Sequence, residues 1–153
     1  MLTKKSKYAI KALVALARHY NTEGPLRIAE IAKSEKIPGK FLEAILLELR
    51  KHGILGSKKG VNGGYYLIKD PKEVMLSNVM RITDGPIALI PCVSLNFYEK
   101  CEECESELIC GLREIALKVR DASLDILSNT SIGDIKEREE KLAKTKSKKV
   151  KKK

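Results

Sequence analysis

The sequence predicts a mainly α-helical fold with one small β-hairpin: a winged helix-turn-helix DNA-binding domain followed by a long C-terminal dimerisation helix. Three observations lead to this prediction. Two short apolar helical patterns lie on either side of a tight turn, and a glycine-rich connection between two short apolar runs follows them directly. A regular apolar seam then occupies residues 112–126. The 153 residues suffice for one hydrophobic core with an appended helix.

The first predicted helix spans residues 4–20. Its apolar positions follow the i, i+3, i+4, i+7 spacing of one helix face: Ile10, Leu13, Val14 and Ala17. A break at Gly24-Pro25 separates it from a short second helix around Ile28 and Ile31. Pro38 then opens a third helix, and Gly53 is expected as its C-cap.

The third helix has one apolar face and one polar face. The apolar positions are Phe41, Leu42, Ile45, Leu46 and Leu49, and the opposite face carries Lys40, Glu43, Ala44 and Leu47. The first face is expected to pack in the core and the second to enter a DNA major groove. Winged-helix folds also serve as protein-interaction modules, so this alternative stays open.

A β-hairpin is predicted next. The runs 54–55 and 65–68 enclose a connection with Gly60, Asn62, Gly63 and Gly64, which favours a hairpin turn. A hairpin directly after the second helix of a helix-turn-helix is a wing, and Lys58 and Lys59 at its tip are placed to reach phosphate.

Charge is distributed unevenly along the chain. The formal net charge of +10 divides into +8 for residues 1–60, −6 for residues 61–140 and +8 for residues 141–153. A basic first third suggests a polyanion as its partner, here double-stranded DNA. The lysine-rich end, 134–153, is expected to be disordered, either as a solubilising tail or as a nonspecific nucleic-acid arm.

The seam after residue 110 predicts a helix that packs along a second helix. Its members step by three and four residues: Leu112, Ile115, Val119, Ala122 and Ile126. A helix of this length is not fully covered by so small a domain, so a homodimer is expected, with some packing against the first helix of the same chain.

All four cysteines lie in one acidic loop: Cys92, Cys101, Cys104 and Cys110. Thiolates are soft ligands that suit an iron-sulfur cluster or zinc, and a thiol-disulfide switch or inert thiols remain alternatives. Neighbouring glutamates raise a thiol pKa, which weakens the switch interpretation.

Several of these segments together resemble the Rrf2 family of winged-helix transcription regulators. The segments are MLTKKSKYAIKALVALA, IAEIAKSEKIPGKFLEAILLELRKHGIL, GSKKGVNGGYYL and ITDGPIALIPC. The resemblance extends from residue 1 to about residue 133. It implies a repressor that binds a palindromic operator as a homodimer, with Pro38, Lys40, Phe41 and Glu43 reading DNA and Lys59 standing where relatives often have arginine.

The resemblance also implies a sensor. Cys92, Cys104 and Cys110 occupy the three cysteine-ligand positions of cluster-binding members, with a [2Fe-2S] cluster favoured. Members complete the set with a histidine three residues after the last cysteine or with an acidic residue near the start of the first helix. Here those positions hold Arg113 and Lys7. Cys101 is the best remaining fourth ligand, and a loop glutamate is the alternative.

The resulting organisation is a DNA-binding domain at 1–84, a cysteine-rich sensor loop at 85–110, a dimerisation helix at 111–133 and the tail at 134–153. No catalytic constellation and no small-molecule substrate site are expected. No membrane segment is expected either, and the predicted location is cytoplasmic.

Overall fold

The computed structural model describes residues 2–22 and 24–150, with side chains up to residue 146. Three helices open the chain: α1 (Lys4–Arg18), α2 (Ile28–Glu35) and α3 (Gly39–Lys51). The antiparallel strands β1 (Leu55–Lys58) and β2 (Gly64–Leu67) follow, paired from Leu55 with Leu67 to Lys58 with Gly64. The predicted class, mainly helical with a two-stranded wing, is confirmed.

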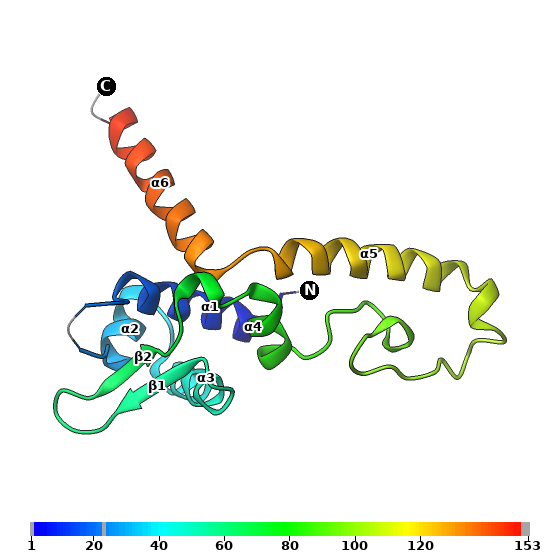
Figure 1. Ribbon diagram of the computed structural model, residues 1–153, viewed down its shortest axis with the longest axis horizontal. Coiled ribbons are helices and arrows are strands. Elements are labelled where there is room, and N and C mark those ends of the chain that lie inside the picture. The colour runs from blue at the N-terminus through cyan, green and yellow to red at the C-terminus, as the bar shows by residue number, and fades with distance from the viewer. Residues whose placement is uncertain (1, 23, 151–153) are drawn as a thin grey trace.

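The remaining elements connect this domain to a long helix. They are the short 3-10 turn η1 (Pro71–Glu73), α4 (Leu76–Thr83), the 3-10 turns η2 (Pro91–Val93) and η3 (Glu107–Ile109), α5 (Gly111–Ser128) and α6 (Ile132–Val150). Sequence patterns did not predict α4. In Figure 1, α5 extends away from the helical body, and the segment with η2 and η3 runs beneath it.

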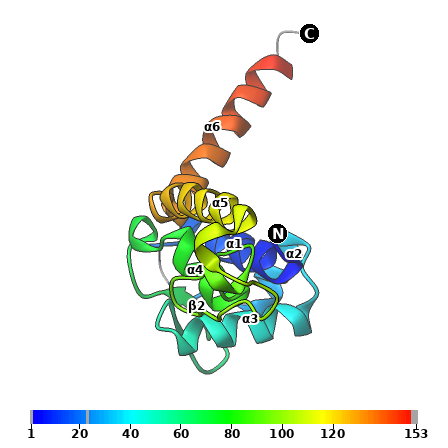
Figure 2. The same ribbon diagram turned by 90° about the vertical axis from the view of Figure 1, so that its right-hand side faces the viewer.

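The core gathers around α1, which packs against α2, α3, α4, β2 and α6. Its largest fully buried side chains are Leu13, Ile31, Leu42, Ile45, Leu46, Leu49, Leu55, Val79 and Ile132. This core is aliphatic, and it leaves the other face of α3 free. Figures 1 and 2 both place α3 on the side of the body opposite α6.

Local chemistry explains where the first helices begin and end. The Thr3 side chain accepts a hydrogen bond from the Ser6 amide and so caps α1. Lys36 ends α2 in the left-handed conformation, at φ 54°. Pro38 stands directly before α3, where its lack of an N–H costs nothing. The C-cap of α3 is His52 and not Gly53 as predicted; Gly53 follows it at φ 72°.

The C-terminal boundary differs from the prediction. Helix α5 ends at Ser128, and residues 132–150 form α6 instead of a disordered tail; residues 151–153 of that predicted tail lie outside the described part. The Ser131 hydroxyl accepts from the Asp134 amide at 3.1 Å and donates to the Asp134 carboxylate at 2.7 Å, which caps a new helix. Ile132 is fully buried in the core.

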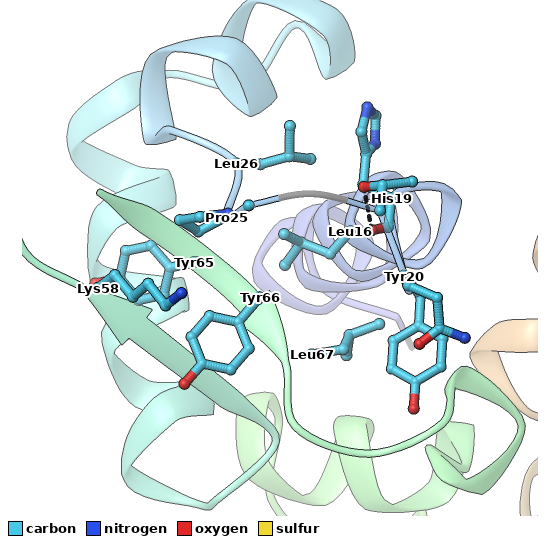
Figure 3. Close-up of a pocket in the computed structure, with 12 residues that line it drawn as sticks. Leu16, His19, Tyr20, Pro25, Leu26, Lys58, Tyr65, Tyr66 and Leu67 are labelled. Carbon is cyan, nitrogen blue, oxygen red and sulfur yellow. Dashed lines mark hydrogen bonds between the residues drawn. The ribbon is translucent and has the colours of Figure 1, made fainter. Parts of the chain in front are cut away.

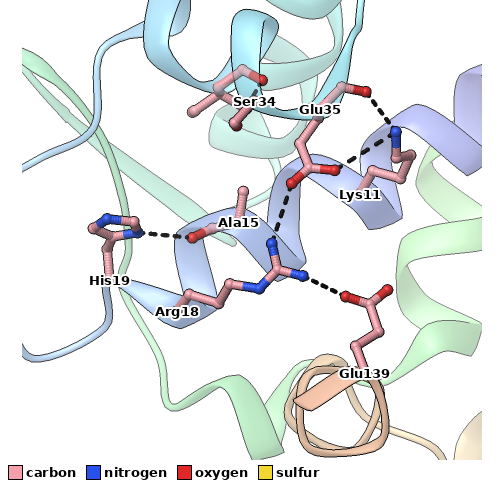
Figure 4. A network of polar contacts seen from close by, with 8 residues as sticks. Lys11, Ala15, Arg18, His19, Ser34, Glu35 and Glu139 are labelled. Carbon is pink, nitrogen blue, oxygen red and sulfur yellow. Dashed lines mark hydrogen bonds and ion pairs between the residues drawn. The ribbon is translucent and has the colours of Figure 1, made fainter. Parts of the chain in front are cut away.

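Ion pairs hold α6 to the body. Arg18 on α1 pairs with Glu35 of α2 at 3.2 Å and with Glu139 of α6, as Figure 4 shows, and Lys72 pairs with Glu137 at 3.0 Å. The sequence prediction weighed the low hydrophobicity of the tail and missed these few anchoring contacts.

No helix in the described part of the chain is long and apolar enough to cross a membrane.

Candidate nucleic-acid interface and cysteine loop

Helix α3 presents the residues predicted to read DNA. Pro38, Lys40 and Glu43 are exposed, and the Phe41 side chain is partly exposed at 41%. Leu42, Ile45, Leu46 and Leu49 are buried in the core as predicted, whereas Phe41, predicted on the same face, is exposed. These exposed residues therefore lie on or beside the solvent face of the first two turns of α3.

Phe41 is partly exposed and also packs against α1. Its ring meets Tyr8 of α1 edge to face, with 5.8 Å between ring centroids and 80° between ring planes. On the next turns, Lys5 of α1 pairs with Glu48 of α3 at 2.7 Å. Both contacts fix the angle of α3 on α1, so the exposed face of α3 is carried on a rigid support.

The wing is tied to α3 and to the α1–α2 loop. Arg50 at the end of α3 donates to the Ser57 hydroxyl of β1 at 2.9 Å. On the other side, Leu26 and Tyr65 exchange backbone hydrogen bonds of 2.9 and 2.8 Å. A Cβ at Gly64 would lie 2.2 Å from the Leu26 carbonyl oxygen, so only glycine permits this close approach.

The two wing lysines occupy different places. Lys58 ends β1, and Figure 3 shows its side chain beside Tyr65 and Tyr66 at a pocket of about 320 Å³. Lys59 lies in the turn itself, just before Gly60, whose φ of 103° reverses the chain. Both lysines are exposed. Lys59 is the more distal of the two on the hairpin.

Helix α5 carries an uncovered apolar stripe. All five predicted dimer residues are exposed in the single chain, with Leu112 at 66% and Val119 at 41%: Leu112, Ile115, Val119, Ala122 and Ile126. The buried face of α5, centred on Ala116, packs against α4 and η2 rather than chiefly against α1. The stripe is therefore a surface without an intramolecular partner among the described residues.

The cysteines are spread over one loop and the start of α5. Cys92 lies in η2 and is only 5% exposed, whereas Cys101, Cys104 and Cys110 are partly exposed. Cys110 is the N-cap residue of α5. Cys101 packs against the small cluster formed by Cys92, Val93 and Ala116. All four thiols are free.

The thiols influence each other electrostatically. Burial raises the pKa of Cys104, and its hydrogen bond and charge interaction with Cys110 raise this pKa further, followed by the charges of Cys101 and Cys92. The pKa of Cys110 is lowered, first by the Arg113 backbone N–H and also by the hydrogen bond from Cys104. Cys110 at the start of α5 is thus the more readily ionised thiol of this pair.

Polar side-chain contacts that the sequence did not reveal connect the cysteine loop to the start of α5. The Tyr98 hydroxyl donates to Glu107 at 2.7 Å, and this hydrogen bond raises the pKa of Tyr98. Arg113 Nε lies 3.2 Å from the other Glu107 oxygen in an ion pair whose geometry is not that of a hydrogen bond. Long-range side-chain pairs of this kind leave no periodic signal in a sequence.

The cysteine loop has the right ligand types for a soft metal, but its side chains are not arranged to bind one. Four thiols within electrostatic reach of one another suit iron-sulfur or zinc ligation. Among the described residues, however, no three histidine, cysteine, aspartate or glutamate side chains form a group that could hold a metal ion as they stand. The loop therefore supplies the ligand types and would have to close further to use them together.

Comparisons with known proteins agree with this architecture. The Rrf2 family, described as an iron-dependent transcriptional regulator, matches residues 2–138. An rrf2-like HTH-type transcriptional regulator of Rhodobacter capsulatus is 41% identical over 137 residues, which cover 88% of this chain and 91% of that protein. The HTH-type transcriptional regulator CymR of Bacillus subtilis is 27% identical over 134 residues and is covered to 88%.

Solved structures show the same fold. The structure of CymR, the global cysteine regulator of B. subtilis, matches with a TM-score of 0.74 at 26% identity, covering 90% of this chain and 97% of that one. T. potens IscR matches with a TM-score of 0.71 over 93% of this chain and 90% of that one. Its sequence identity is 22%, so this match supports only the fold.

Proposed function

Because this chain belongs to the Rrf2 family of transcriptional regulators, we propose that it acts as a repressor that binds a palindromic operator as a homodimer and senses a signal through its four-cysteine loop. Its relatives are regulators and not enzymes. A role on DNA places its proposed site of action in the cytoplasm. The three parts of the proposal rest on separate observations.

DNA binding rests on the exposed face of α3 beside the wing. Lys40 and Glu43 are solvent-exposed on a helix whose other face is anchored in the core, and Lys58 and Lys59 extend from the adjacent hairpin. Residues 1–60 carry a net charge of +8, which favours a phosphate backbone as partner. We assign base contacts to Lys40 and Glu43, a supporting contact to Pro38 and Phe41, and phosphate contacts to the two wing lysines.

Homodimerisation rests on the stripe along α5. Its five apolar side chains are exposed on an 18-residue helix and have the three-four spacing that pairs helices. A second copy offers the same stripe, and a two-fold axis through it would present two α3 helices to two half-sites. Such half-sites lie about 34–36 Å apart, one turn of DNA.

Sensing rests on the donor set of the loop. In this proposal Cys92, Cys104 and Cys110 hold an iron-sulfur cluster, a [2Fe-2S] cluster being favoured, with Cys101 as fourth ligand or a loop glutamate in its place. A bound cluster would supply a group that responds to iron-sulfur supply, redox state or nitric oxide. The presence of four cysteines in one loop and the soft chemistry of thiolates support this assignment.

A second candidate keeps the DNA-binding role and changes the chemistry of the loop. The electrostatic interaction between Cys104 and Cys110, together with the lowered pKa of Cys110, favours a thiol-disulfide pair. Structural zinc on the same four thiolates is a further form of this alternative. Either would leave the protein colourless.

The loop assignment is tested by purifying the protein without oxygen and measuring visible absorption, iron, sulfide and zinc. We expect a brown protein with iron and sulfide in near-equal amounts. Cys92→Ala, Cys104→Ala and Cys110→Ala should each lose the cluster, whereas Cys101→Ala decides between the two fourth ligands. An unchanged spectrum in Cys101→Ala favours a glutamate or an exogenous ligand as the fourth ligand. Zinc or no metal in the unaltered protein refutes the cluster.

A further inference from the structure

Cys92 belongs to a small hydrophobic cluster of its own. Cys92, Val93 and Ala116 form this cluster, and all three are nearly fully buried. The main core around α1 contains none of them. The turn that carries Cys92 therefore packs on α5 through Ala116, with Ala88, Ile90 and Cys101 of its own loop around it, and outside the main core.

Arg120 of α5 makes the polar contact that fastens this turn. Its Nη1 donates to the Val93 carbonyl oxygen at 2.6 Å, and its Nε and Nη2 donate to Asp121 Oδ1 at 2.8 and 2.7 Å. The Arg120 side chain is only 14% exposed. Asp121 thus orients the guanidinium while its third nitrogen holds the residue next to Cys92.

Arg120 also lies next to the apolar stripe and to a surface pocket. It directly follows Val119 of the apolar stripe on α5, and both residues line a cavity of about 230 Å³ between α5 and the segment 84–89. The Arg120–Val93 hydrogen bond joins the cysteine loop to α5 beside this pocket.

We propose that Arg120 is the positioning residue that holds the Cys92 turn on α5 and so couples the cysteine loop to the dimerisation stripe. The second half of this proposal, coupling of the loop to the dimerisation stripe, rests on the sensor role proposed above. The first half, positioning of the Cys92 turn by Arg120, does not depend on that role. The hydrogen bond joins Val93, next to Cys92, to the turn of α5 that carries Val119, so a displacement of the Cys92 turn would reach the apolar stripe through Arg120.

Alkylation of the reduced, metal-free, full-length protein by iodoacetamide tests the positioning, with the rate at each cysteine read by mass spectrometry. Arg120→Met removes a charged hydrogen bond to a buried carbonyl, so the rate at Cys92 relative to Cys110 should rise about tenfold. Arg120→Lys, which can still donate one hydrogen bond, should restore part of the protection. Lys118→Met removes a cation from the same helix away from Val93 and should behave as the unaltered protein.

Two results would overturn the positioning role. One is an unchanged Cys92-to-Cys110 ratio in Arg120→Met. The other is a parallel rise at all four cysteines, which would mean that the substitution loosens the whole loop and does not act on Cys92.

The coupling is tested by DNA affinity before and after loading with iron and sulfide. In Arg120→Met the DNA affinities before and after loading should differ by no more than about twofold. Iron content and dimer mass should match those of the unaltered protein. A ratio as large as in the unaltered protein refutes the coupling. If the unaltered protein takes up no iron, the cluster proposal fails, and the alkylation rates still decide the role of Arg120.

Discussion

Asp84 joins the start of the first helix to the end of the fourth. Its carboxylate accepts hydrogen bonds from the Thr3 amide, at 3.2 Å, and from the Thr3 hydroxyl. Beneath this contact, the buried hydroxyls of Ser6 and Thr83 are hydrogen-bonded to each other. A carboxylate at a helix N-terminus also interacts favourably with the helix dipole. This polar joint fixes α4, and through it α5, relative to the DNA-binding helices.

Stability should depend on Asp84 in acid. Burial raises the pKa of Asp84, but hydrogen bonds from Thr3 and Ser6 and the charge of Lys5 outweigh burial, so the pKa lies below that of an ordinary aspartate. A lowered folded-state pKa contributes stability that is present above about pH 4 and is lost as pH falls through the folded-state pKa.

We therefore expect Asp84→Ala to lower the free energy of unfolding by about 1–2 kcal/mol at pH 7. The difference from the unaltered protein should shrink below about pH 4, as measured by urea unfolding across pH. Glu99→Ala, which removes an exposed loop carboxylate, is the matched control and should have no comparable effect. Equal losses at pH 7 and pH 3 would contradict the role of the charged carboxylate.

Lys59, in the turn of the wing, is the residue to which we assign the most distal phosphate contact. Lys59→Ala should weaken binding to many sequences alike and reduce the magnitude of the salt slope by about one, since one phosphate contact is lost. Fluorescence anisotropy at several salt concentrations measures both. Lys118→Ala on α5 is the control for net charge. An unchanged slope for Lys59→Ala would mean that the wing tip does not touch phosphate.

At the scale of elements, α5 is a helix with one face covered and one face open. The covered face holds the Cys92 turn and α4, while the open face carries the apolar stripe. In a single chain the stripe exposes large apolar side chains over most of the helix length. A second copy can cover such a surface, which makes the helix both the support of the loop and the proposed dimer contact.

Val119→Asp separates folding from dimerisation. Because Val119 is 41% exposed in the single chain, a carboxylate there can remain hydrated in a folded monomer. In a paired helix seam the same carboxylate would be buried without a partner, at a cost of about 2 kcal/mol or more per chain. We expect a folded monomer by sedimentation and circular dichroism. Lys118→Asp places the charge beside the stripe and should stay dimeric; a stable Val119→Asp dimer would place the interface elsewhere.

For the whole molecule, the arrangement of charge follows the arrangement of parts. Residues 1–60, with a net charge of +8, include α1, α2, α3 and β1, whereas the acidic cysteine loop runs along α5, away from the helical body. Helix α6 leaves the body on the side opposite α3. The cysteine loop and the exposed face of α3 are thus separate parts of the molecule, and in the proposed sensor a signal would pass along α5 or between subunits.

A dimer built on α5 would fix the spacing of its two α3 helices. Inserting about five base pairs, half a helical turn, between operator half-sites should turn one half-site to the opposite side of the DNA and sharply weaken binding. Inserting about ten base pairs, which restores the rotational phase but lengthens the site, is the matched comparison. Affinity that ignores the five-pair insertion would show that each subunit binds independently.

Local patterns in the sequence determined most of the DNA-binding domain. The apolar spacing of α1 and α3, Pro38 before a helix and the glycines of the hairpin each act on neighbouring residues, so they can be read without knowing the fold. They located the exposed face of α3, the wing and the stripe on α5. The same local reading placed all four cysteines in one loop.

Only the tertiary structure decided what brings distant segments together. The Asp84–Thr3 joint, the Tyr98–Glu107–Arg113 chain and the Arg120–Val93 hydrogen bond connect residues that have no fixed spacing in the sequence. Helix α6 depends on the burial of Ile132 and on the Arg18–Glu139 pair, because its own composition is too polar to show a strong helical face. Such contacts are selected by the packing of the whole chain, and their energies exist only once that packing has formed.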